Sequence, residues 1–102
     1  MQFLLFKKLE MNAVERAVIA KYVSDYIIDT FLVEEALNAL ELTRLVRDIT
    51  NDLVSLKVDV PIIAALAKSN VMIDPRVKIC PRGNGTGPEL WFTTESSRIE
   101  NN

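Results

Sequence analysis

The stretch CPRGNGTGPELWF, residues 80 to 92, contains all three glycines of the chain within five positions. A phosphate-binding loop would need a lysine and a hydroxyl side chain after its last glycine, whereas a proline follows Gly87. A dinucleotide-binding fingerprint would need another glycine spacing within a parallel βαβ unit, and a flexible linker would leave little chain to fold beyond it. Asn84-Gly85 instead favours the positive φ angles of a tight turn, so the stretch predicts a β-hairpin.

Residues on both sides of this turn favour β-strands. From Val77 to Cys80, apolar side chains alternate with a basic one at the period of two expected for a strand. The run from Leu90 to Thr94 is rich in aromatic and β-branched residues. Trp91 and Phe92 must point to opposite faces of this strand, so we expect one of them in the core. The polar segment of residues 95 to 102 is expected to be a frayed tail.

The chain before the hairpin has the periodicity of helices. Asn12 and Glu15 have the spacing of a capping box, which predicts the start of a helix. Apolar residues then recur every three or four positions and predict one broad buried face over residues 13 to 29. That face comprises Val14, Ala17, Val18, Val23, Tyr26 and Ile27.

A second helical pattern begins near Leu32, and its apolar stripe then changes phase. One stripe ends at Leu40 and another begins at Leu42, so we expect a bend or a short extended link at residues 40 to 43. Thr43 would then cap a further helix over residues 44 to 54. A single long helix with a twisted stripe is the alternative.

Pro61 predicts the start of the last of these helices. The short polar connection of residues 55 to 59 precedes it, and a proline in the first helical turn costs no hydrogen bond. We expect this helix to run to Ser69 or Asn70, because an asparagine readily adopts the left-handed conformation that ends a helix.

The composition is that of one ordinary globular domain. With 102 residues, 49% of them hydrophobic and 25% charged, the chain can build one core but not two. No run approaches the roughly 18 to 20 apolar residues of a membrane span, and the lysines near the start follow the apolar run instead of preceding it as in a secretory signal. We therefore expect a cytoplasmic protein with no membrane partner.

The sequence lacks the residues of the common catalytic systems. The absence of histidine excludes Ser-His-Asp and Cys-His nucleophiles and histidine metal ligands. The single cysteine, Cys80, excludes an internal disulfide and a cysteine zinc cluster. The acidic residues form no paired-carboxylate motif, so we expect no enzyme, no metal and no cofactor.

The order of helices, short turn, helix and hairpin resembles the winged-helix members of the helix-turn-helix superfamily. The residues that carry the resemblance are LVRDITNDLVSLKVDVPIIAALAKSNVMI, residues 45 to 73, followed by VKICPRGNGTGPELWFT, residues 77 to 93, as the wing. The resemblance implies an α+β, mostly helical winged helix-turn-helix domain over residues 12 to 94, with three to four helices before a C-terminal β-hairpin. An apolar arm (residues 1 to 11) would precede it and a polar tail (residues 95 to 102) would follow.

The resemblance also implies a partner, double-stranded DNA. The net charge is −2, but residues 68 to 82 contain four basic residues and one acidic residue, which favours a positive face beside the wing. The leading hypothesis is a small non-catalytic DNA-binding protein that regulates transcription in a virus, plasmid or microbe. The expected DNA contacts are Lys68, Ser69, Asn70, Arg76, Lys78, Arg82 and Asn84.

The helix expected in the major groove, residues 60 to 70, has Lys68, Ser69 and Asn70 as its polar side chains, all at its end. This is few for reading base edges. The alternative hypothesis is therefore a winged-helix adaptor subunit that binds a protein within a transcription or replication complex.

Arg44 and Arg47 lie on a charged helix face near Glu41, Asp48 and Asn51. We expect the two arginines to pair with these neighbours and not to bind a partner.

The apolar residues Phe3, Leu5, Phe6 and Leu9 precede the first capped helix. Such a segment would pack as an extra element or act as an adhesive arm. We expect a homodimer formed through this segment and the first helix, because linking two weak half-sites raises affinity.

Overall fold

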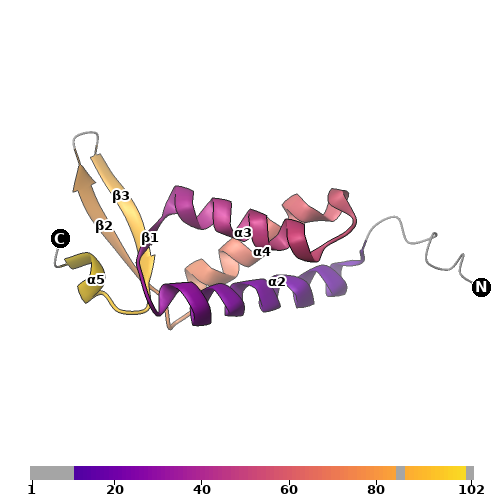
Figure 1. Cartoon of the computed structure of the whole chain (residues 1–102), viewed down its shortest axis with the longest axis horizontal. Coiled ribbons are helices and arrows are strands. Elements are labelled where there is room, and N and C mark those ends of the chain that lie inside the picture. The colour runs from indigo at the N-terminus through magenta and orange to yellow at the C-terminus, as the bar shows by residue number, and fades with distance from the viewer. Residues whose placement is uncertain (1–10, 85–86, 101–102) are drawn as a thin grey trace, which may run out of the picture.

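The computed structural model describes residues 11 to 84 and 87 to 100. Within these residues, four α-helices and one small antiparallel sheet form an α+β fold (Figure 1). In chain order the elements are α2 (Ala13–Ile27), a π-helix (Ile28–Leu32), β1 (Leu37–Asn38), α3 (Ala39–Leu53), a 3₁₀ turn (Lys57–Asp59), α4 (Val60–Ile73), β2 (Lys78–Asn84), β3 (Gly87–Thr93) and α5 (Ser97–Glu100). In the part of the chain described, no helix combines the length and the apolar character needed to cross a membrane.

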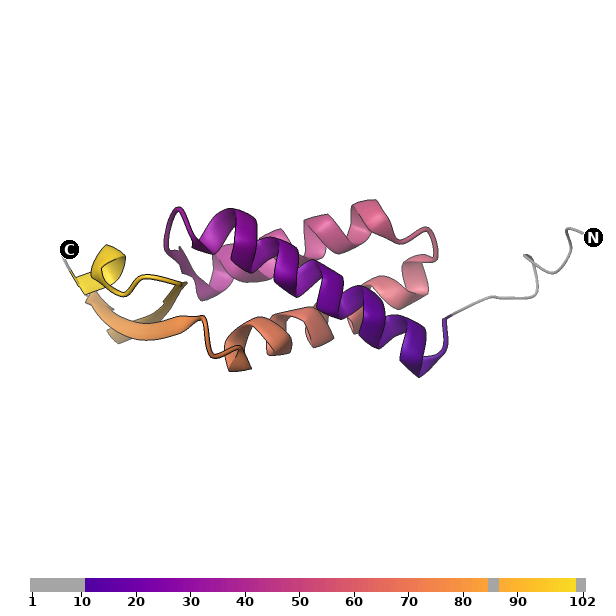
Figure 2. The same ribbon diagram turned by 90° about the horizontal axis from the view of Figure 1, so that it is seen from below.

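The three long helices pack together, and the hairpin lies at one end of them. In Figure 1, α2 runs along the bottom and α3 along the top, with α4 between and behind them. Figure 2 shows α2 crossing in front of the other two helices. The larger fully buried side chains come from all of these elements: Ile27, Ile28, Leu32, Leu42, Val46, Ile63, Val71 and Phe92.

Helix α2 begins as predicted but buries a different face. Asn12 Oδ1 accepts from the Glu15 N–H at 2.8 Å, and Glu15 Oε1 accepts from the Asn12 N–H at 3.0 Å, which confirms the capping box. Of the six apolar residues predicted to be buried, only Val23 and Ile27 are, and they share the buried face with Ala20 and Ser24. The prediction was wrong for the others because apolar residues occupy more of the helix circumference than its neighbours can cover.

The break before α3 lies earlier than predicted. Residues 33 to 38 leave the helix and form a turn and strand β1, so both the helix expected from Leu32 and the single long helix are wrong. Asn38 caps α3 through a second capping box, in which its Oδ1 accepts from the Glu41 N–H at 2.8 Å. Thr43 is not a cap, since its hydroxyl donates to the Ala39 carbonyl inside the helix.

Helix α4 starts with Pro61 in its first turn, as predicted, and continues past Asn70 to Ile73. The predicted stop at Asn70 was wrong because the buried stripe of Ile63 and Ala67 continues at Val71 and holds the helix on the core. The helix ends at Ile73, before Asp74, whose conformation is extended as expected for a residue that precedes a proline.

The predicted hairpin is present and belongs to a sheet with the order β1-β3-β2. Ile79 pairs with Phe92 and Cys80 with Trp91, so Phe92 is fully buried on one face while Trp91 lies on the other. The short strand β1 was not predicted. It joins the sheet as a third strand because its Leu37 pairs with Phe92.

Part of the tail that was expected to fray, residues 97 to 100, is helical. Residues 97 to 100 form the short helix α5, and Ile99 is buried. Arg98 donates to the carbonyl oxygens of Leu32 at 3.1 Å and Val33 at 2.6 Å. It thereby satisfies acceptors left open where the π-helix ends.

A buried carboxylate fixes the start of α4 against the start of α2. Asp59 is fully buried, and its carboxylate accepts from Arg16 Nε at 2.9 Å. It also accepts from the backbone N–H of Met11 at 3.1 Å. These contacts join residues that are 43 and 48 positions apart in the sequence.

Candidate functional site

The solvent-facing side of α4 is almost entirely apolar. Ser69 is the only polar member of its seven exposed residues, and the others are Pro61, Ile62, Ala65, Leu66, Met72 and Ile73. Ile73 is 77% exposed, and Ile62, Leu66 and Met72 are each about 40% exposed. The opposite face of the same helix packs on the core through Val60, Ile63, Ala67 and Val71. A helix that is apolar on nearly all sides is normally covered on all sides.

This surface has little capacity to read base edges. Base readout in the major groove uses side chains such as Arg, Lys, Asn and Gln that donate to or accept from the bases. The exposed face of α4 offers one hydroxyl, that of Ser69, while Lys68 and Asn70 are half-buried at its two edges. The α4 surface is therefore chemically suited to an apolar partner.

Basic side chains border this surface where α4 meets α3. A hollow between the two helices is lined by Thr43, Val46, Arg47, Pro61, Ala64, Ala65 and Lys68. An adjoining hollow is lined by Arg47, Asn51, Lys57, Val60 and Pro61. Neither set of lining residues contains an acid. Arg47, Lys57 and Lys68 from these two hollows are therefore called the basic rim of the α4 surface.

The charges of this basic rim are not neutralised within the described residues. Arg47 and Lys68 have no hydrogen bond or ion pair there, nor does Arg44, so the expected pairing of the two arginines with their helix neighbours is wrong. Lys57 Nζ donates to the backbone and side-chain oxygens of Asn51, each at 3.0 Å, and these acceptors are neutral. The rim can attract carboxylates or phosphates.

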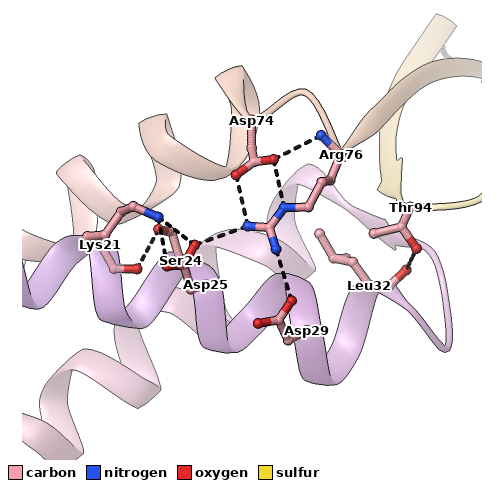
Figure 3. Close-up of polar contacts among 8 residues, drawn as sticks. All are labelled: Lys21, Ser24, Asp25, Asp29, Leu32, Asp74, Arg76 and Thr94. Atoms are coloured by element: carbon pink, nitrogen blue, oxygen red, sulfur yellow. Dashed lines mark hydrogen bonds and ion pairs between the residues drawn. The ribbon is translucent and has the colours of Figure 1, made fainter.

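Arg76, expected on DNA, is the centre of an ion-pair cluster (Figure 3). Its guanidinium donates to Asp74 through Nε and Nη2, to Asp25 through Nη2 and to Asp29 through Nη1, all at 3.0 Å. Lys21 also donates to Asp25, at 2.7 Å. The cluster ties α2 to the connection between α4 and β2.

The electrostatics of this cluster leave no surplus positive charge. Hydrogen bonds from the Arg76 side chain lower the pKa of Asp74 below its usual 3.8. The hydrogen bond from Lys21 is the main cause of a lowered pKa at Asp25, and Arg76 adds to it. Three carboxylates surround two cations, so the contacts of Arg76 are those of a structural residue.

The remaining predicted contacts lie on the hairpin. Lys78, Cys80 and Arg82 occupy alternate positions of β2 and therefore share one face of the sheet with Trp91. The Arg82 guanidinium carbon lies 5.0 Å from the Trp91 ring centroid, in the range of a cation–π contact. The backbone of Asn84 pairs with Gly87 at the end of the hairpin.

The structure thus divides the predicted site among separate features. Lys68, Ser69 and Asn70 belong to α4, Arg76 to the ion-pair cluster, and Lys78 and Arg82 to the hairpin. The predicted dimer residues Phe3, Leu5, Phe6 and Leu9 lie outside the described residues. Sequence reasoning assigned no binding role to Arg47 or Lys57 and missed the exposed apolar face, although the spacing of Ile62, Leu66 and Ile73 indicates a second apolar stripe on α4.

The described residues contain no group of three or more Cys, Asp or Glu side chains arranged to hold a metal ion. No family model, no curated protein and no solved structure matches the chain.

Proposed function

We propose that this chain is a winged-helix adaptor that binds a protein partner through the exposed apolar face of α4. The order of elements supports the winged-helix assignment, since α3, a short turn and α4 lead directly into a two-stranded hairpin. The observation that carries the function is the composition of the α4 surface, on which Ser69 is the only exposed polar residue. Contiguous exposed apolar surface marks sites of protein interaction.

The basic rim favours a partner that carries acidic side chains beside its apolar contact surface. Arg47 and Lys68 flank the α4 surface and carry charges that no described acid balances. A partner with acidic side chains around an apolar centre would match both features, because complementary charge at the rim guides association.

Affinity purification of the tagged chain from cells that express it tests the adaptor function. We expect the wild type to retain a partner, and we expect Ile62→Ser/Leu66→Ser to reduce the amount of retained partner at least tenfold. The matched control is Val33→Ser/Leu40→Ser, which removes apolar side chains that are 41% and 57% exposed, against 41% and 40% for the α4 pair. Equal retention by both double variants would exclude the α4 surface as the binding site.

DNA binding is the second candidate function, and the basic rim is the observation that favours it. Fluorescence anisotropy of labelled random-sequence duplex DNA over a salt series measures it. If DNA contacts the rim, Arg47→Ala and Lys68→Ala should each reduce the log–log salt slope by roughly 0.9, the value for one phosphate contact. Lys78→Ala and Arg82→Ala test the hairpin in the same way. No binding at low salt by the folded protein would exclude this candidate.

A further inference from the structure

A second uncovered apolar surface lies on α2. Four side chains recur there every four residues and therefore lie along one side of the helix. They are Val14, Val18, Tyr22 and Tyr26, and their exposed fractions are 71, 63, 58 and 43%. The two tyrosine rings stack with their centroids 6.4 Å apart.

This stripe borders two hollows, one between α2 and the connection that follows α3, and one between α2 and α3. The first is lined by Met11, Val14, Glu15, Val18, Ile19 and Leu56. The second, further along α2, lies between α2 and α3 and is lined by Tyr22, Tyr26, Ile49, Asp52 and Leu53. We call the two hollows together the α2–α3 groove. Its lining is apolar or aromatic except for the two acids, Glu15 and Asp52.

We propose that the α2–α3 groove is the docking site of the chain's own N-terminal segment, residues 3 to 9. This segment, FLLFKKL, contains five large apolar side chains and two lysines, and it lies outside the described residues. When an apolar segment binds in an apolar groove, the apolar surfaces of both are removed from water, which is favourable.

The point of attachment brings the segment to the groove. Met11 is the first described residue, its side chain lines one end of the groove, and its N–H is held by Asp59 at 3.1 Å. From Val14 to Tyr26, α2 is about 18 Å long. Seven extended residues span about 23 Å, so residues 3 to 9 are long enough to cover the stripe after the chain reverses direction.

The charges of the segment and the groove are complementary. Lys7 and Lys8 lie among the apolar residues of the segment, and Glu15 and Asp52 are the charged residues of the groove. Among the described residues, no basic side chain lines either hollow, so lysines of the docked segment would find only opposite charge there.

A second copy of the chain is the competing occupant, as in the homodimer expected from the sequence. Attachment at Met11 favours the chain's own segment, because a short connection gives an effective concentration in the millimolar range. A second copy would reach this concentration only in very concentrated solution.

Cross-linking in the full chain tests the proposal. With Cys80→Ser as the background, Phe6→Cys/Leu53→Cys is treated with a short bismaleimide at micromolar protein concentration, and the products are identified by gel and mass spectrometry. We expect a cross-link within one chain that forms at least tenfold faster than in the control pair Phe6→Cys/Leu66→Cys. Leu53 and Leu66 are matched in exposure, at 50% and 40%.

Equal rates for the two pairs would overturn the proposal, and so would cross-linked dimers through Leu53, which would assign the groove to a second copy. A second measurement avoids the substitutions in the groove. Deletion of residues 2 to 10 should raise the fluorescence of the dye 8-anilinonaphthalene-1-sulfonate severalfold while circular dichroism shows an intact helical fold. Unchanged dye fluorescence would also overturn the proposal.

Discussion

Replacement of the buried Asp59 with alanine should destabilise the fold strongly. The carboxylate is fully buried and accepts from Arg16 Nε at 2.9 Å and from the Met11 N–H at 3.1 Å. Removing one partner of a buried ion pair costs about 3 to 5 kcal/mol. The Arg16 side chain is 19% exposed and can regain some water, which places the expected loss near the lower end, about 3 kcal/mol.

Urea unfolding at pH 7, followed by circular dichroism, measures this loss as a change in the free energy of unfolding. For a domain of this size the Tm should fall by roughly 12 °C or more. Asp48→Ala on the exposed side of α3 is the control and should change stability by less than about 0.5 kcal/mol. A loss below about 1 kcal/mol for Asp59→Ala, with an unchanged m value, would refute the argument that the buried carboxylate holds α2 and α4 together.

Three further substitutions test other contacts. Arg76→Gln should let the pKa of Asp74 return toward 3.8. The difference in the free energy of unfolding from the wild type should therefore be largest at neutral pH and shrink as the pH falls below about 4. A pH-independent difference in urea titrations would contradict this. Asn38→Ala should cost about 1 kcal/mol in the same titrations, because it removes the cap of α3, and no loss would rule out that role. Arg82→Ala should shift the emission of Trp91, the only tryptophan, since it removes the cation over the ring; an unchanged spectrum would contradict this contact.

The helices and the hairpin were predicted from local signals. The boundary between α2 and α3 was missed, although a local signal for it exists. The sequence NAVE at residues 12 to 15 predicted a capping box, and NALE at residues 38 to 41 has the same pattern and forms the same motif. The second motif was overlooked because Leu37 and Leu40 have the spacing of one helical stripe, which predicted a helix across this boundary. Leu37 belongs to β1, where pairing with Phe92 overrides its helical spacing.

Which apolar face is buried could not be predicted from periodicity alone. Val14 and Val18 fit the helical stripe as well as Val23 does, but α2 turns Val23 toward the core and leaves the two valines exposed. The choice depends on the small residues Ala20 and Ser24, which are buried together with Val23.

The ionic contacts of the candidate site were also beyond local reasoning. Arg76 was expected on DNA, whereas two of its three carboxylate partners, Asp25 and Asp29, lie 51 and 47 positions away. Such pairs are set by the packing of α2 against α4, which no short stretch of sequence encodes. The hairpin contact between Arg82 and Trp91 is more local, since it follows from the register of two consecutive strands.

The two-residue strand β1 gives the hairpin a mechanical connection to the helices. Asn38 pairs with Trp91 in the sheet and at the same time caps α3. One residue therefore serves as the joint between the hairpin and the first turn of α3. A displacement of the hairpin that moves Asn38 would therefore also disturb the cap of α3.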